Sequence, residues 1–144
     1  MIFSMQIEHP QGTINLITCH LRSNGYSTAR RQMGTESKWS DGLEDYVRRL
    51  DYGYKARAVQ AQSICKALSE QEKRPTLILG DFNDLSGSYS LKTIQGEELS
   101  DAWWEGGLGP GFTFNAYHLL LRLDHILYSS DFELEQVQLE SNIT

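Results

Sequence analysis

Residues 75–84, with the sequence PTLILGDFND, constrain the fold of this chain more than any other stretch. Residues 77–79 form a short continuous apolar run, which is the pattern of a strand buried on both faces. The run stops at Gly80, and Asp81 and Asn83 follow directly. Two oxygen-bearing side chains are therefore expected at the end of a buried strand.

Asp81 and Asn83 admit two interpretations. Residues two apart point the same way if the chain stays extended, and a carboxylate beside an amide oxygen suits a hard cation or a phosphoryl group. In the alternative, the two side chains cap a turn by bonding to nearby backbone N–H groups. The stretch by itself favours neither.

The composition indicates a single globular domain over residues 1–144, with 40% hydrophobic and 22% charged residues. The charge is uneven, because residues 75–144 hold 11 Asp or Glu against two Lys or Arg. An acidic half either concentrates cations around Asp81 or is simply a solvated acidic surface, and the lack of a broad basic face disfavours duplex nucleic acid as a partner. We find no membrane-length apolar run and no targeting signal, so the sequence assigns no location.

A histidine ends a strand predicted near the start of the chain. Residues 3–7 and 13–21 alternate in hydrophobicity around a turn, which predicts a β-hairpin with His20 at the far end of its second strand. An imidazole there lies where a core meets a cleft, although a lone histidine is more often structural. Residues 22–42 are polar and predict a long loop, either a functional lid or a mobile connection.

A second carboxylate lies in the strand predicted over residues 122–128. Strand periodicity places Asp124 on the face of Arg122, and His125 on the opposite face. A carboxylate among apolar neighbours requires a partner if it is buried, either a histidine, an arginine or a metal. The simplest partner is the neighbouring Arg122.

The remaining periodicity predicts an α/β domain. Helical spacing favours helices over 42–51 and 54–72, the second with a core-facing stripe of Ala61, Ile64, Cys65 and Leu68. Arg57 and Gln60 lie beside this stripe, where they are solvated or contact a substrate or the strand ends. Other expected elements are a short helix over 89–94, a strand at 112–115 and a bulged last strand over 132–139.

Four segments together resemble the endonuclease/exonuclease/phosphatase superfamily, the fold of DNase I and apurinic endonucleases. The pair of Gly-Asp-Phe-Asn and, later, Leu-Asp-His-Ile-Leu is the most specific part of this resemblance. The chain also resembles a bacterial branch of this superfamily at residues 20–23, 57–61 and 88–89. The four segments are 18–21 (TCHL), 80–83 (GDFN), 111–114 (GFTF) and 122–129 (RLDHILYS).

The resemblance implies a four-layer α/β sandwich with two facing sheets, of which this chain supplies half. We expect one mixed or antiparallel sheet with helices on one face. The other face is then apolar and requires a partner, either the missing N-terminal half of the fold or a second copy of the chain.

The resemblance also implies roles for individual residues. His20 contacts the phosphate or protonates the leaving oxygen, Asp81 orients or deprotonates the attacking water, and Asn83 is its partner on the phosphate or metal. Asp124 becomes the carboxylate that orients a catalytic histidine. Asp81 and Asn83 are the expected ligands of Mg²⁺ or Mn²⁺. Candidates for contact with a phosphate-ester substrate are Arg22, Ser23, Arg30, Arg31, Arg57 and Asn115, and for the four arginines an ordinary surface position is the more frequent case.

The chain departs from the family pattern at both ends. The metal-binding Asn and Glu of the family have no counterpart before Met1. No Ser-Asp-His segment follows Asp124 to supply the histidine that Asp124 would orient. His125 does not replace that histidine, because adjacent strand residues face opposite ways. We therefore expect a C-terminal fragment of a metal-dependent phosphoesterase, inactive alone. The alternative is a non-catalytic binding or structural domain with an incomplete site.

Overall fold

A mixed five-stranded sheet lies at the centre of the computed structural model, which describes residues 1–23, 39–116 and 119–140. Its strand order is β1-β2-β3-β7-β4, in which β2 and β3 are parallel and the other neighbouring pairs antiparallel. The predicted N-terminal hairpin is confirmed. The strands are β1 (Ile2–His9), β2 (Gly12–His20), β3 (Thr76–Asp81), β4 (Leu99–Asp101) and β7 (Asp124–Ser129).

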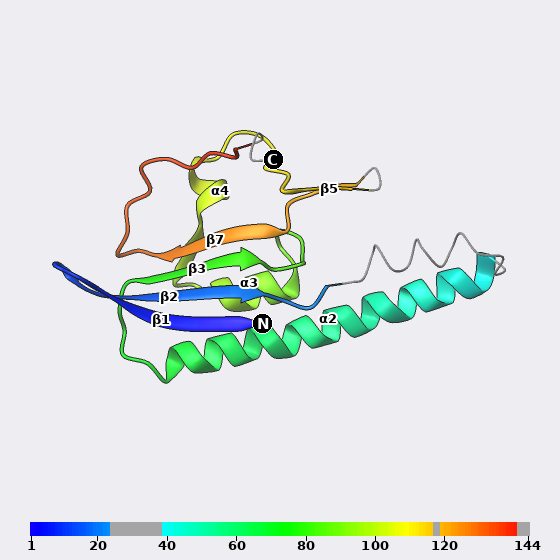
Figure 1. The fold of residues 1–144 in the computed structure, drawn as a ribbon, viewed down its shortest axis with the longest axis horizontal. Helices are drawn as coiled ribbons and strands as arrows, with labels where there is room; N and C mark the ends of the chain where they lie inside the picture. The colour runs from blue at the N-terminus through cyan, green and yellow to red at the C-terminus, as the bar shows by residue number, and fades with distance from the viewer. Residues whose placement is uncertain (24–38, 117–118, 141–144) are drawn as a thin grey trace.

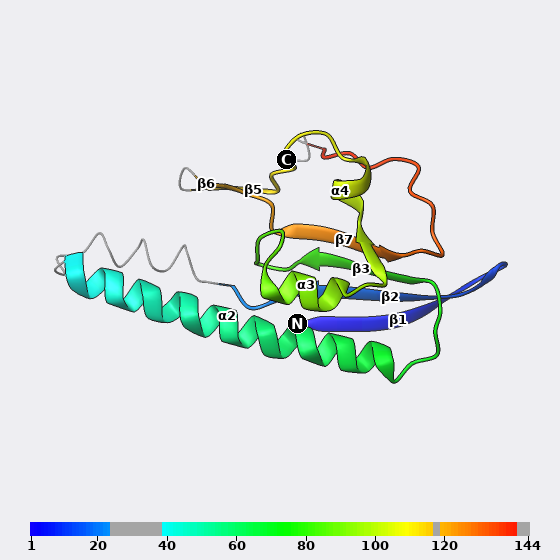
Figure 2. The ribbon, with the colours of Figure 1, turned by 180° about the vertical axis from the view of Figure 1, so that it is seen from behind.

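Helices cover one face of this sheet. Figure 2 shows α3 in front of the strands, whereas the opposite view in Figure 1 shows the strands uncovered. Of the helices in the described ranges, none is both long and apolar enough to cross a membrane. The helices are α2 (Trp39–Ser69), α3 (Tyr89–Gln95) and α4 (Ala102–Gly106), and a small separate hairpin joins β5 (Phe114–Ala116) to β6 (Leu119–Leu121).

The hydrophobic core fills the space between the sheet and its helices. Alternate strand residues, Ile17, Ile78 and Leu127, point into it and are almost fully buried. The predicted stripe of α2 meets them through Ala61 and Ile64, and α3 adds two further buried side chains. The period-2 pattern of the strands and the helical spacing of α2 therefore combine as the sequence predicts.

The prediction of two helices over 42–51 and 54–72 is wrong, since α2 is one continuous helix of 31 residues. It also begins at Trp39, inside the segment expected to be a loop; residues 24–38 lie outside the described part of the chain. Gly53 suggests a break, but a single glycine inside a helix costs only about 1 kcal/mol. An ion pair between Lys55 Nζ and Asp51 Oδ2, 2.6 Å long, spans the glycine and supports helix continuity.

The predicted bulged strand over 132–139 is also wrong, because the described residues after Ser130 form no strand. The apolar side chains of this segment pack against a helix instead of a strand, since Leu134 and Val137 lie beside Gly106 of α4. A period of two produces a strand only where a neighbouring strand offers hydrogen-bond partners. None of the described strands pairs with this segment.

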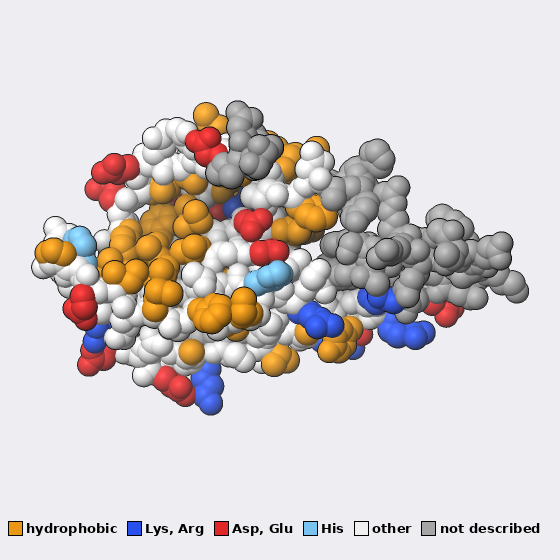
Figure 3. Space-filling model, viewed as in Figure 1, with side chains coloured by type: hydrophobic (Ala, Val, Ile, Leu, Met, Phe, Trp, Pro, Cys, Tyr) orange, Lys and Arg blue, Asp and Glu red, His pale blue; other side chains and the backbone are white. Residues whose placement is uncertain are grey.

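The face of the sheet opposite the helices is apolar and open. Phe3, Met5 and Ile7 of β1 are 54%, 47% and 42% exposed, and Ile126 of β7 is 46% exposed. Hydrophobic side chains accordingly gather over this face in Figure 3. The expectation that residues 77–79 are buried on both faces is wrong, because Leu77 and Leu79 face this open side and are only half-buried.

Candidate active site

Three polar side chains from three neighbouring strands meet at one end of the open face. His20 of β2 pairs in register with Asp81 of β3, which pairs in turn with Asp124 of β7. His20 Nε2 lies 3.7 Å from Asp81 Oδ2, and the two side chains are 61% and 35% exposed. Figure 3 shows acidic groups and a histidine side by side, next to the apolar area. Three candidates from distant parts of the sequence thus form one row.

The loop after β3 folds Asn83 back onto Asp81. Asn83 has a φ of 50°, so the chain is not extended there. Its backbone N–H donates to Asp81 Oδ1 at 2.8 Å, and its amide Nδ2 donates to Asp81 Oδ2 and to the Leu21 carbonyl, both at 3.1 Å. The turn-capping interpretation is therefore present in the structure, and the cap itself is what orients the Asp81 carboxylate.

Gly80 allows β2 and β3 to approach each other at the site. A Cβ on this residue would lie 2.0 Å from the Cys19 carbonyl oxygen, and its φ is 141°. Only glycine meets both conditions without displacing the neighbouring strand. The glycine before Asp81 is thus required by the strand pair that brings His20 and Asp81 together.

The pKa of Asp81 is raised above its ordinary value of 3.8, chiefly because partial burial disfavours the charged carboxylate. The hydrogen bond from Asn83 opposes this shift, and the Asp124 carboxylate adds to it by repulsion. The nearby imidazoles of His20 and His125 lower the pKa by a smaller amount. A carboxylate tuned upward in this way is a better proton acceptor than an ordinary aspartate.

Arg57 does not lie at the surface. Its side chain is fully buried, and its Nε donates to Asp84 Oδ2 at 3.0 Å. Arg22 and Ser23 are exposed beyond β2, where the Arg22 guanidinium lies 5.3 Å from the centre of the Tyr52 ring. Contact of these residues with a substrate stays a prediction, and Arg57 is not exposed to make one directly in this structure.

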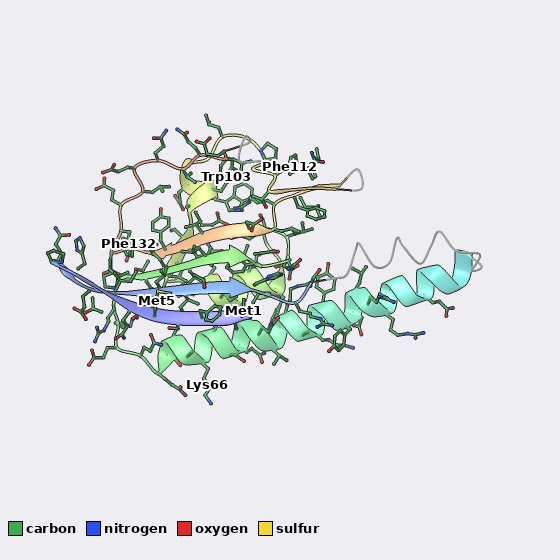
Figure 4. The ribbon with its side chains drawn as sticks, in the orientation of Figure 1. Met1, Met5, Lys66, Trp103, Phe112 and Phe132 are labelled. Carbon is green, nitrogen blue, oxygen red and sulfur yellow. The ribbon has the colours of Figure 1, made fainter. Side chains whose placement is uncertain are left out.

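A hairpin flanks the row on the side of Asp124. The hydroxyl of Thr113, just before β5, accepts hydrogen bonds from the backbone N–H groups of Leu123 and Asp124, each at 3.1 Å. Asn115 is exposed on β5, and its contact with a substrate stays a prediction. Figure 4 shows Trp103 and Phe112 near the base of this hairpin, and Met5 on β1 of the open face. Arg30 and Arg31 lie outside the described residues.

The alternative in which Asp124 forms an ion pair with Arg122 is wrong. Arg122 precedes β7 and turns inward, where its Nη1 and Nη2 donate to the two carboxylate oxygens of Asp101, each at 2.9 Å. His125 Nδ1 lies 3.1 Å from Asp101 Oδ2 in the same buried cluster. His125 therefore faces away from Asp124, as strand alternation predicts, while Asp124 itself is exposed.

Asp101 is the residue that the sequence did not single out. It ends β4 and is the N-cap of α4, where its carboxylate accepts hydrogen bonds from the N–H groups of Trp103 and Trp104, and it also binds Arg122 and His125. The only sequence signal is an aspartate directly before a short helical segment. Its partners Arg122 and His125 are distant in the sequence, so no periodicity of the sequence predicts these contacts.

A family model for the endonuclease/exonuclease/phosphatase family matches residues 15–143 of the chain. The chain belongs to the endonuclease/exonuclease/phosphatase family. The resemblance of the sequence to this superfamily is therefore confirmed, and the resemblance to a bacterial branch stays a prediction. A search among curated proteins gives no match.

Solved structures of the superfamily share the fold. Humanized D. rerio TDP2 aligns with a TM-score of 0.56 at 17% identity, covering 90% of this chain and 44% of its own. A hairpin-deletion mutant of Staphylococcus aureus beta toxin gives 0.56 at 16%, covering 94% and 46%. A beta toxin mutant with bound magnesium ions gives 0.53 at 17%, covering 92% and 43%. The chain thus has a partial DNase I-like fold, and it spans less than half the length of these structures.

Oxygen-bearing side chains lie close together in this part of the sheet. Asp81, Asn83 and Asp124 supply carboxylate and amide oxygens, the chemistry that Mg²⁺ prefers. In the described ranges, no group of three His, Cys, Asp or Glu side chains is arranged to hold a metal ion. Magnesium commonly binds through one or two carboxylates and keeps several waters, so this donor set fits a partial site.

Proposed function

We propose that the chain carries one half of the active site of a metal-dependent phosphoesterase. The observation that supports this most is the row of His20, Asp81 and Asp124 across three neighbouring strands, oriented by the Asn83 turn. Membership of the endonuclease/exonuclease/phosphatase family supports the same class of reaction. The substrates are phosphodiesters or phosphomonoesters.

In this proposal each residue acts at the phosphate or at the attacking water. Asp81 takes the proton of the water, which its raised pKa favours. His20 donates a hydrogen bond to a phosphoryl oxygen and stabilises the charge that develops in the transition state. Asn83 keeps its N–H groups on Asp81 and on the Leu21 carbonyl, so it acts by orienting Asp81 and by offering its side-chain oxygen to the metal or phosphate site. Asp124 orients a histidine supplied from outside the described residues. Asp81 and Asn83 would hold a magnesium ion, which supplies Lewis-acid stabilisation of the phosphoryl oxygens.

We further infer that a second sheet of the family fold covers the open apolar face. The related structures are more than twice as long as the part this chain matches, and the face is broad and apolar. Monomeric proteins rarely leave such a patch exposed. The second sheet would also bring the missing metal ligands and histidine. We call this chain together with the second sheet the assembled protein.

The proposal is tested by hydrolysis of bis-p-nitrophenyl phosphate and p-nitrophenyl phosphate with Mg²⁺. We expect activity in the assembled protein and none in the 144-residue chain alone. Loss of activity on adding EDTA and its return with Mg²⁺ would support the metal requirement. An assembled protein inactive on both esters would favour a non-catalytic binding domain instead.

The 144-residue chain alone is expected to bind Mg²⁺ only weakly. Its described residues offer two neighbouring carboxylates and one amide, without a third acidic or histidine ligand in a metal cluster. Isothermal titration calorimetry with MgCl₂ should show a dissociation constant no tighter than about 1 mM, the range of weak oxygen-ligand sites. Micromolar binding would show that the chain carries a complete metal site.

The chain alone is also expected to self-associate through its open face. Burying Phe3, Met5 and Ile7 against a second copy removes apolar surface from water. Size-exclusion chromatography with light scattering should show a dimer or larger species, and Met5→Lys should shift it to a monomer. Lys66→Glu, an exposed change on the helix side, is the matched control. A monomeric wild-type chain would contradict the inferred role of this face.

A further inference from the structure

Arg57 reaches two segments of the chain at once. It is 0% exposed, and its Nε donates to Asp84 Oδ2 at 3.0 Å. Its Nη1 donates to the backbone carbonyl of Arg22 at 2.9 Å. One turn further along α2, Gln60 Oε1 accepts the backbone N–H of the same Arg22 at 2.9 Å. One face of α2 therefore holds both backbone groups of Arg22 and the carboxylate of Asp84.

These two segments are the exits of the strands that carry the candidate site. Arg22 follows His20 by two residues, and Asp84 follows Asp81 by three. The segments also bind each other, because Leu21 N–H donates to the Asp81 carbonyl at 2.9 Å and Asn83 Nδ2 donates to the Leu21 carbonyl at 3.1 Å. The separation of His20 from Asp81 is thus set partly from behind the sheet, by α2.

The guanidinium suits this task better than other side chains. Its planar fork presents several donors in fixed directions, so it bonds Asp84 and the Arg22 carbonyl simultaneously. The Tyr54 ring lies 4.7 Å from the guanidinium carbon and shields it from water. A charge-assisted hydrogen bond in such a dry site is strong and geometrically strict.

We propose that Arg57 is a positioning residue, which fixes His20 and Asp81 relative to each other by clamping the segments that follow them. This inference rests on the proposed phosphoesterase function for its catalytic consequence, but the clamp itself is a property of the chain alone. Arg57 touches neither of the two site side chains. Its effect passes through the Arg22 backbone and Asp84.

The clamp is tested by amide hydrogen exchange on the 144-residue chain. Two reporters belong to the clamped region: the N–H groups of Leu21 and Asn83, which bond to Asp81. A third, the N–H of Thr76 at the other end of β3, bonds to Ser129 Oγ at 2.9 Å. In Arg57→Gln, exchange at Leu21 and Asn83 should accelerate at least about tenfold more than at Thr76.

Two further variants separate positioning from general loss of stability. Ile64→Ala removes a fully buried side chain from the same helix without touching the clamp, so all three amides should accelerate alike. Gln60→Leu is a milder change that removes only the acceptor of the Arg22 N–H. It should accelerate hydrogen exchange at the neighbouring Leu21 N–H but not at Asn83 or Thr76, and it keeps the test decisive if Arg57→Gln does not fold. Equal acceleration of all three amides in Arg57→Gln and no selective change in Gln60→Leu would overturn the proposal.

The catalytic consequence is measured in the assembled protein on bis-p-nitrophenyl phosphate. Arg57→Gln should lower kcat by about 10- to 100-fold with little change in KM, whereas Ile64→Ala should retain kcat at a temperature where both are folded. If wild type is inactive, the proposed function fails, and the exchange result still decides the clamp. If wild type is active and Arg57→Gln matches Ile64→Ala, Arg57 is only structural.

Discussion

In the assembled protein, Asp81→Asn is expected to lower kcat for phosphoester hydrolysis by about 10²- to 10⁴-fold, the effect of removing a general base. Asparagine has nearly the same shape as aspartate and keeps an oxygen that accepts the backbone N–H of Asn83, so the main bond of the turn should persist, whereas the second bond from Asn83 Nδ2 loses its acceptor. What disappears is the proton acceptor and the negative charge beside His20. The measurement is kcat on bis-p-nitrophenyl phosphate with saturating Mg²⁺.

Asp51→Asn is the matched control for this variant. It makes the same chemical change on an exposed face of α2, where Asp51 pairs with Lys55. We expect its kcat to equal that of wild type. If Asp81→Asn keeps more than about a tenth of the wild-type kcat, Asp81 is not the base and the proposed mechanism is wrong.

The pH dependence of the same reaction follows from the raised pKa of Asp81. The base works only when deprotonated, so activity should fall as the pH drops through this pKa. Burial raises the pKa of Asp81 above 3.8 in the metal-free chain, whereas a Mg²⁺ ion held by Asp81 would favour the carboxylate, so the acid limb should move to higher pH as the Mg²⁺ concentration is lowered. Asp124→Asn removes a neighbouring negative charge and should move that limb to lower pH.

The strands and their polar ends could be predicted because they depend on local periodicity. Alternation in β2 places His20 in phase with Leu16, and the apolar run of β3 ends at Asp81. What the sequence does not contain is the register that sets His20 opposite Asp81 and Asp81 opposite Asp124. Family resemblance supplied that grouping before the structure did.

The buried ion pairs could not be predicted because their partners are far apart in the sequence. Arg57 and Asp84 are separated by 27 residues, and Arg122 and Asp101 by 21. A charged residue next to an apolar stripe looks like an ordinary surface residue until its partner is known, because charged side chains are seldom buried unless paired. For that reason the sequence leaves Arg57 open between solvent, a substrate and the strand ends, and the structure shows the contact with the segments that follow the strand ends. For the same reason the sequence offers Arg122 as a partner of Asp124 and gives no sign of Asp101.

Asp101→Ala is expected to destabilise the 144-residue chain by about 3–5 kcal/mol, the cost of breaking a buried ion pair from one side. The change would leave the Arg122 guanidinium and the His125 ring buried without their carboxylate. It would also remove the cap of α4. The measurement is urea unfolding at pH 7, with wild type and variant at the same protein concentration.

Glu98→Ala provides the contrast, because Glu98 forms an ion pair of the same 2.9 Å length with Lys73 at an exposed site. Solvent screens that pair, so we expect no measurable change in the free energy of unfolding. The double variant Asp101→Ala with Arg122→Met should lose less stability than the sum of the two single variants, since neither charge then remains buried alone. Additive losses would show that Asp101 and Arg122 act independently.

The acid stability of the chain should also depend on Asp101. Burial alone would raise its pKa, but the hydrogen bonds and positive charges of His125 and Arg122 outweigh burial and hold the pKa well below its usual range. In acid the unfolded chain therefore binds this proton before the folded chain does, and protons favour unfolding. The stabilisation is complete above pH about 4 and is lost as the pH falls further. Asp101→Asn should therefore show a shallower loss of stability below pH about 4 than wild type, and an identical acid profile would place the acid sensitivity elsewhere.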